Sequence, residues 1–100
     1  MITIFAKLQA AEGKEDEFRS AAETMVAAVS ENEPDVMKYA LHEVDGSPGT
    51  FLLHEVYAND EALKAHGQTD HMKAFGQTLK GISGARPEIS RVTEITDVQR

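Results

Sequence analysis

Apolar and polar residues alternate at the start of the chain. Isoleucine, alanine or leucine occupies every even position from Ile2 to Leu8, and most of the residues between them are polar. Alternation with a period of two predicts a β-strand over residues 2–9 with one face in a core. Phe5 interrupts the polar series, so the second face of this strand is also partly apolar.

After Gly13 the hydrophobic period lengthens to that of a helix. The residues at i, i+3, i+4, i+7, i+8 and i+11 are Phe18, Ala21, Ala22, Met25, Val26 and Val29. Such spacing places them in one apolar stripe of an amphipathic helix. The acidic residues at 15–17 suit the positive end of the helix dipole, and Pro34 marks where the helix ends.

Two β-rich segments follow, over residues 36–44 and 50–58. The residues between them read Asp-Gly-Ser-Pro-Gly, which is the composition of a tight turn. The pattern therefore predicts an antiparallel hairpin.

The next segment carries two helix-start signals. Asn59 or Asp60 can cap a short helix through about His66, and Thr69 can cap a second one. We expect Gly67-Gln68 to separate the two helices. The apolar stripe of the second helix consists of Met72, Phe75 and Leu79.

Residues 81–87 have the composition of a loop, and residues 88–98 are rich in Ile, Val and Thr. These β-favouring residues predict a last strand over 88–98. The same segment repeats apolar residues every third position, which also fits a helix unless a bulge or two buried faces intervene. We interpret it as a strand.

The predicted order is β-α-β-β-α-β, which indicates an α+β, ferredoxin-like unit with helices on one face of an antiparallel sheet. One hundred residues suit a single domain over residues 1–100. The other sheet face would expose Phe5 and one register of the hairpin. Because that surface is too apolar to stay open, we expect a homodimer.

Composition narrows the possible functions. Ten Lys and Arg against 17 Asp and Glu give a formal charge of −7, which disfavours nucleic acid and anionic membranes as partners. Cysteine is absent, so thiolate chemistry and disulfides are excluded. No apolar run approaches the roughly 18 residues of a membrane span, and no secretory signal is visible. We expect a soluble, cytoplasmic protein.

The segment from His54 to Phe75 concentrates the candidate chemistry. His66 and His71 lie about 140° apart around a continuous helix, whereas helical zinc motifs place two histidines at i and i+4. A break at Gly67 would bring the two histidines together, but no third ligand is evident. The pattern therefore does not favour a metal site, and the glycines match no phosphate-binding loop.

Glu55, His66 and His71 are instead candidates for acid–base chemistry. Glu55 shares a strand face with Leu53 and Tyr57, where a carboxylate either has a partner or acquires a raised pKa. An imidazole at the edge of a helix–sheet cavity can accept a phenolic proton near neutral pH. The alternatives are a water-exposed rim position for Glu55 and capping or core-edge roles for the histidines.

Four aromatic residues could line a pocket for a planar ligand, although such residues also build ordinary cores. They are Tyr39, Phe51, Tyr57 and Phe75.

The stretch FLLHEVYANDEALKAHGQTDHMKAF and the opening MITIFAKLQAAEGKEDEF resemble the antibiotic biosynthesis monooxygenase domain family. The resemblance covers nearly the whole chain, and Glu55, Tyr57, His66 and His71 match its motif, followed by Phe75. It implies a dimeric α+β barrel with a cavity between sheet and helices in each subunit. Two features depart from the family: Glu33-Pro34-Asp35-Val36 replaces the frequent Glu-Pro-Gly-Cys, and tryptophan, on which the haem-degrading branch depends, is absent.

The resemblance implies a cofactor-independent monooxygenase that oxidises a small quinol or phenolic, polyketide-like substrate with dioxygen. His66 or His71 would be the base, Glu55 would orient that histidine or bond to the substrate, and the aromatic residues would hold the ring. No metal or other cofactor is expected. The alternative is an isomerase or a non-enzymatic binding protein that uses the same cavity.

Overall fold

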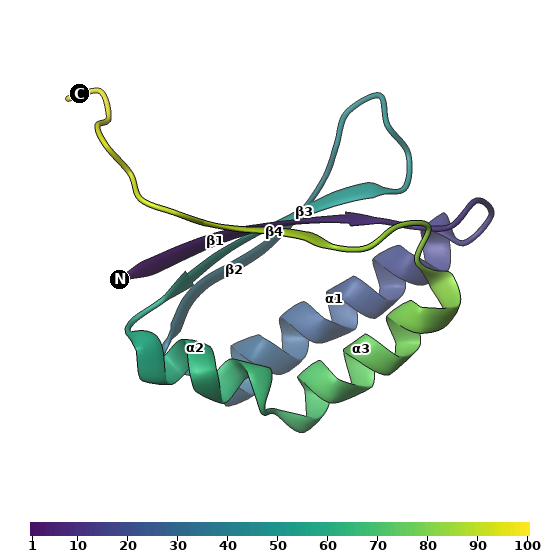
Figure 1. The fold of residues 1–100 in the computed structure, drawn as a ribbon, viewed down its shortest axis with the longest axis horizontal. Helices are drawn as coiled ribbons and strands as arrows, with labels where there is room; N and C mark the ends of the chain where they lie inside the picture. Colours follow the sequence, from purple (N-terminus) through teal and green to yellow (C-terminus); the bar gives the residue numbers. More distant parts are fainter.

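The computed structural model describes residues 1–100 as one four-stranded sheet covered on one face by three helices (Figure 1). The elements in chain order are β1 (Ile2–Gln9), α1 (Glu15–Asn32), β2 (Val36–Glu43), β3 (Thr50–Tyr57), α2 (Asp60–Gly67), α3 (Asp70–Ile82) and β4 (Glu88–Val92). The predicted α+β, ferredoxin-like order is confirmed, with the second helical region divided into α2 and α3 as expected.

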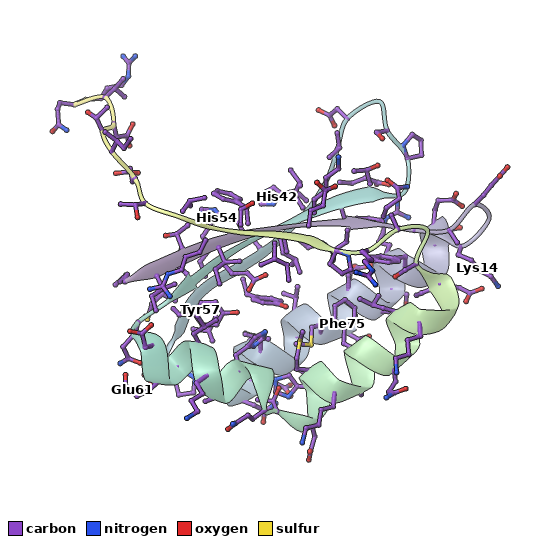
Figure 2. All side chains as sticks on the ribbon, viewed as in Figure 1. Lys14, His42, His54, Tyr57, Glu61 and Phe75 are labelled. Carbon is purple, nitrogen blue, oxygen red and sulfur yellow. The ribbon has the colours of Figure 1, made fainter.

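The sheet is antiparallel with the order β2-β3-β1-β4. Its pairings place Glu55 between Ile4 of β1 and Tyr39 of β2, on the face that the helices cover. The neighbouring register points the other way, so Phe5 stacks on His54 with ring centroids 4.6 Å apart on the uncovered face. Figure 2 shows His42 and His54 on this uncovered side, opposite the helices.

The core lies between the sheet and α1, where the predicted apolar stripe is buried. Phe18 is fully buried and stacks on Phe51 of β3, with centroids 5.3 Å apart and ring planes 4° from parallel. Met25 and Val29 continue this contact along α1. Phe51 is therefore a central core residue at the level of the first turns of α1.

The last strand is shorter than predicted. β4 covers residues 88–92 rather than 88–98, and the chain beyond it leaves the body of the molecule (Figure 1). The reason is the register, because Val92 pairs with Thr3 near the start of β1, which is the only neighbour of β4. Ile95, which lies beyond this point, is 94% exposed.

None of the three helices combines the length and the apolar character that crossing a bilayer would require.

Candidate functional site

Two imidazoles converge on the carboxylate of Glu33. Nδ1 of His66 lies 3.0 Å from Oε1 of Glu33, and Nε2 of His71 lies 2.5 Å from Oε2. The Glu33 side chain is only 9% exposed, against 7% for His66 and 21% for His71. The sequence stretch that contains both histidines therefore meets the end of α1, 33 and 38 residues away.

The break between α2 and α3 places the two histidines on one carboxylate. α2 ends at Gly67, and Thr69 caps α3 by accepting a hydrogen bond from the Met72 N–H at 3.2 Å. The same Thr69 hydroxyl donates to the carbonyl oxygen of His66 at 2.9 Å, which ties the end of α2 to the start of α3. In one continuous helix these rings would point about 140° apart.

The hydrogen bonds of Glu33 determine which ring nitrogens remain free. An ionised carboxylate can only accept hydrogen bonds, so with Glu33 ionised both rings donate to it. A neutral ring that donates through one nitrogen is an acceptor at the other. Nε2 of His66 and Nδ1 of His71 are then the free acceptors, and neither makes a hydrogen bond to the protein. This is the arrangement of a carboxylate-oriented imidazole base.

Glu55 belongs to a second polar layer beneath His66. The Tyr57 hydroxyl donates to Oε1 of Glu55 at 2.6 Å, and Glu55 is 7% exposed. The rings of Tyr39 and Tyr57 are tilted against the His66 ring at centroid distances of 5.3 and 5.4 Å. Glu55 thus has a buried position with a partner, so the alternative of a water-exposed rim residue is wrong.

Burial controls the ionisation of this layer. It raises the pKa of the Glu55 carboxyl above its usual range, an effect that the Tyr57 hydrogen bond and the nearby His66 charge partly offset. Burial also raises the pKa of the Tyr57 and Tyr39 hydroxyls, and the nearby carboxylates reinforce the effect. Both tyrosines therefore stay neutral throughout the ordinary pH range.

Glu33 occupies the place beside the histidines that Glu55 would fill under the first of its two expected roles, orienting a histidine. Glu55 lies in the sheet and bonds to Tyr57, two residues away on the same strand face, whereas Glu33 caps the end of α1 next to α2 and α3. The sequence signal was available, because Glu33 directly precedes Pro34, where the helix was expected to end. Nothing local linked it to residues so distant in the chain.

Two grooves of about 630 Å³ border α1. One lies between α1 and α3 and has Met25, Phe75 and Ile82 in its apolar lining, with His71 as its only histidine. We call it the α1/α3 groove. In Figure 2 the Phe75 side chain lies on the helix side of the sheet.

The four predicted ring-binding residues do not share one cavity. Phe75 lines the α1/α3 groove, whereas Tyr39 and Phe51 line the second groove, between α1 and β2. Tyr57 is completely buried and contacts Glu55 and His66 instead. Of these four aromatic residues, only Phe75 therefore shares a groove with a histidine, His71.

No group of three or more His, Asp or Glu side chains is arranged to hold a metal ion. His66, His71 and Glu33 bond to one another in a chain through the carboxylate. His42 and His54 lie on the opposite side of the sheet (Figure 2).

Comparison with known proteins gives consistent matches. Residues 1–78 match the family model described as antibiotic biosynthesis monooxygenase. A Bacillus subtilis (strain 168) protein with the name "Putative monooxygenase YcnE" is 30% identical over 97 residues, which is 97% of this chain and 100% of that protein.

Solved structures agree with the fold. A crystal structure named as a "putative antibiotic biosynthesis monooxygenase" from Caulobacter crescentus CB15 is 30% identical, has a TM-score of 0.88, and the match covers 95% of this chain and 90% of that one. The structure of PA3566 from Pseudomonas aeruginosa has a TM-score of 0.86 at 23% identity, covering 95% and 94% of the two chains. At that identity the second likeness concerns the fold.

Proposed function

Because the chain belongs to the antibiotic biosynthesis monooxygenase family, we propose that it is a cofactor-independent monooxygenase acting on a small quinol or phenol with dioxygen. The observation that carries this proposal is the double hydrogen bond of Glu33 to His66 and His71, with His71 facing a groove of ligand size. Groove volumes of roughly 300–1,000 Å³ are typical of small-molecule sites.

In this proposal His71 is the base. Its Nε2–H bonds to Glu33, so Nδ1 accepts the proton of a phenolic hydroxyl in the α1/α3 groove. Glu33 orients the ring and stabilises the imidazolium that forms. His66 acts as a positioning residue, because its bond to the other carboxylate oxygen fixes Glu33. Glu55 and Tyr57 form the wall behind His66.

The substrate supplies the electrons. The deprotonated hydroquinone passes electrons to dioxygen, and one oxygen atom enters the ring. The other oxygen leaves as water, whose two protons come from the two hydroxyls of the hydroquinone, one of them by way of His71. The product is the hydroxyquinone, so the hydroquinone is oxidised and dioxygen is reduced without flavin, haem or metal. The apolar side chains of the groove would pack against the ring of the anion.

Oxygen uptake with a panel of dihydroquinones tests the proposal. We expect uptake without added cofactor and unchanged by chelators, and a fall of about a hundredfold or more in His71→Gln. Lys73→Gln is the matched control, because Lys73 is an exposed residue of the same helix that does not line the groove, and it should keep full turnover. If His71→Gln had the same turnover and the same melting temperature as the wild type, His71 would not be the base.

An isomerase or binding protein using the same groove is the rival function, since isomerisation needs the same proton transfer. Conversion of a ligand under anaerobic conditions, with no oxygen uptake in air, would establish the rival instead.

We also infer that the working unit is a homodimer. Phe5 is 41% exposed and Val92 is 37% exposed on the sheet face that no helix covers. Light scattering at micromolar concentration should give twice the mass of the chain, and Phe5→Glu should shift it toward the monomer. A monomeric mass for the wild type at every concentration would contradict this inference.

A further inference from the structure

The α1/α3 groove runs along two antiparallel helices (Figure 1). Its lining includes His71 at the start of α3 and Ile82 at the end of that helix. At 1.5 Å per residue these positions are roughly 16 Å apart. Asp16 and Glu17, near the start of α1, lie at the end far from His71. The groove is therefore elongated, with one imidazole at one end and two carboxylates at the other.

The middle of the groove offers little to a polar ligand. Met25, Phe75 and Ile82 supply its most buried side chains. The Thr24 hydroxyl donates to the carbonyl of Ser20 at 3.0 Å, and the Thr78 hydroxyl donates to the carbonyl of Ala74 at 3.1 Å. Because both protons are used by the parent helices, these two side chains present no free donor, and the one other hydroxyl of the lining belongs to Ser20, which is exposed. A long apolar group suits this part of the groove.

The charges of the groove select against an anionic tail. No lysine or arginine lines it. At the far end Asp16 pairs with Arg19 at 3.1 Å and Glu17 pairs with Lys14 at 3.3 Å. Both pairs are exposed, so solvent screens them and they leave no strong positive field. A carboxylate placed there would meet two acidic groups without a partner of its own.

We propose that the substrate is an amphipathic phenol or hydroquinone whose hydroxyl meets His71 and whose uncharged hydrocarbon chain occupies the α1/α3 groove toward Asp16. This inference rests on the proposed function for the reaction at His71, and it adds the class of substituent that the substrate carries. Each CH₂ that is fully buried should tighten binding about fourfold.

Binding of a homologous series tests the substrate class without turnover. The dissociation constants of 4-ethylphenol, 4-butylphenol and 4-hexylphenol would be measured by calorimetry on the full chain. We expect the constant to fall by about tenfold or more from ethyl to hexyl. A hexyl chain that ends in a carboxylate should bind more weakly than 4-hexylphenol, because the groove lining contains no cation to pair with it.

Three variants test where the hydrocarbon chain lies. Thr78→Phe fills the groove and should abolish the gain with chain length, and Ala74→Leu should reduce it. Gln77→Phe places the same ring on an exposed neighbouring position of α3 outside the groove, so it should keep the gain. Melting temperatures verify that all three variants fold.

The outcomes separate this inference from the proposed function. Equal binding across the series, equal loss in Thr78→Phe and Gln77→Phe, or equally tight binding of the carboxylate-ended chain would overturn the hydrocarbon-chain assignment. Oxygen uptake with short dihydroquinones would still support the monooxygenase in that case. A clear chain-length gain without oxygen uptake would instead leave the groove assignment standing and remove the oxygenase.

Discussion

Glu33 and Glu55 are carboxylates with almost no exposed surface, yet their surroundings differ. Glu33 caps a helix and accepts hydrogen bonds from two imidazoles that belong to different helices. Glu55 lies in the middle of the sheet and accepts one hydrogen bond from a neighbouring phenol. Burial raises the pKa of Glu55, with the Tyr57 bond opposing the shift.

The difference teaches which carboxylate can assist a base. A group that must stabilise an imidazolium needs direct contact with the ring, and only Glu33 has it. Glu55 makes no hydrogen bond to either imidazole, and its side-chain partner is the Tyr57 hydroxyl. The two acidic residues thus differ in their hydrogen-bond partners, and this difference is the ground for proposing different roles for them.

The largest effect on turnover is expected from replacing Glu33. Glu33→Gln removes the negative charge that stabilises the His71 imidazolium, so turnover of a dihydroquinone should fall by about a hundredfold or more. Oxygen uptake measures it. Glu31→Gln, on an exposed residue of the same helix, is the control and should keep full turnover. Full turnover in Glu33→Gln would show that Glu33 does not assist the base. The proposed difference in role between Glu33 and Glu55 would then be wrong.

The next largest effect is on the stability of the Glu55 layer. Tyr57→Phe deletes the donor at 2.6 Å and leaves a buried carboxyl without its partner, which costs about 1–3 kcal/mol. In a domain of this size the melting temperature should fall by several degrees, which calorimetry would show. The loss should shrink in the double variant Tyr57→Phe, Glu55→Gln, because the neutral amide is easier to leave buried. An undiminished loss would mean that packing of the ring, and not the carboxyl, carries the cost.

A smaller effect concerns the corner that brings the histidines to Glu33. Thr69→Ala removes the cap of α3 and the bond to the His66 carbonyl, with an expected cost of about 1 kcal/mol. Turnover should fall more than in Asn59→Ala, which removes the corresponding cap of α2 without touching the corner. Thr69→Ser should restore both quantities. Equal turnover in the two alanine variants would show that the corner does not position the imidazoles.

The smallest effect is a pH dependence. A carboxyl whose pKa is raised on folding binds protons more tightly in the folded state, so stability falls as the pH rises above the ordinary value of 4.5 toward the raised pKa. Glu55→Gln cannot ionise and should lack this fall. Melting temperatures of both proteins between pH 4 and 8 would show a difference that grows with pH in favour of Glu55→Gln. A constant difference would contradict the raised pKa.

The sequence predicted the fold well because its signals were local. Alternation gave β1, the 3.6-residue stripe gave α1, and Asn59 and Thr69 gave the starts of α2 and α3, all within a residue or two of the structure. The predicted end of the last strand, at residue 98, was wrong. A strand continues only where a neighbouring strand can pair with it, and the apolar pattern of residues 93–98 contains no information about where β1 begins. The local apolar pattern therefore predicts that a strand exists, whereas its pairing with another strand determines where it ends.

The candidate site was harder to predict. Glu55 was identified because it interrupts an apolar strand face. His66 and His71 were identified because the chain has only four histidines and these two lie five positions apart. Glu33 was missed, since its importance comes from contacts across 33 and 38 residues. The α1/α3 groove could not be predicted either, because it depends on how two helices pack against one sheet.

From the strand order we expect a particular sequence of events in folding. Only β2 and β3 are joined by a short turn, whereas β1 pairs with β3 and β4, so that Phe5 faces both His54 and Ser90. Pairings between distant segments carry a larger loop-closure cost and form more slowly. The hairpin should therefore gain amide protection before β1 docks, and the Glu33 contacts should form late. Pulsed hydrogen exchange would test this order, and simultaneous protection of β1 and β2 would contradict it.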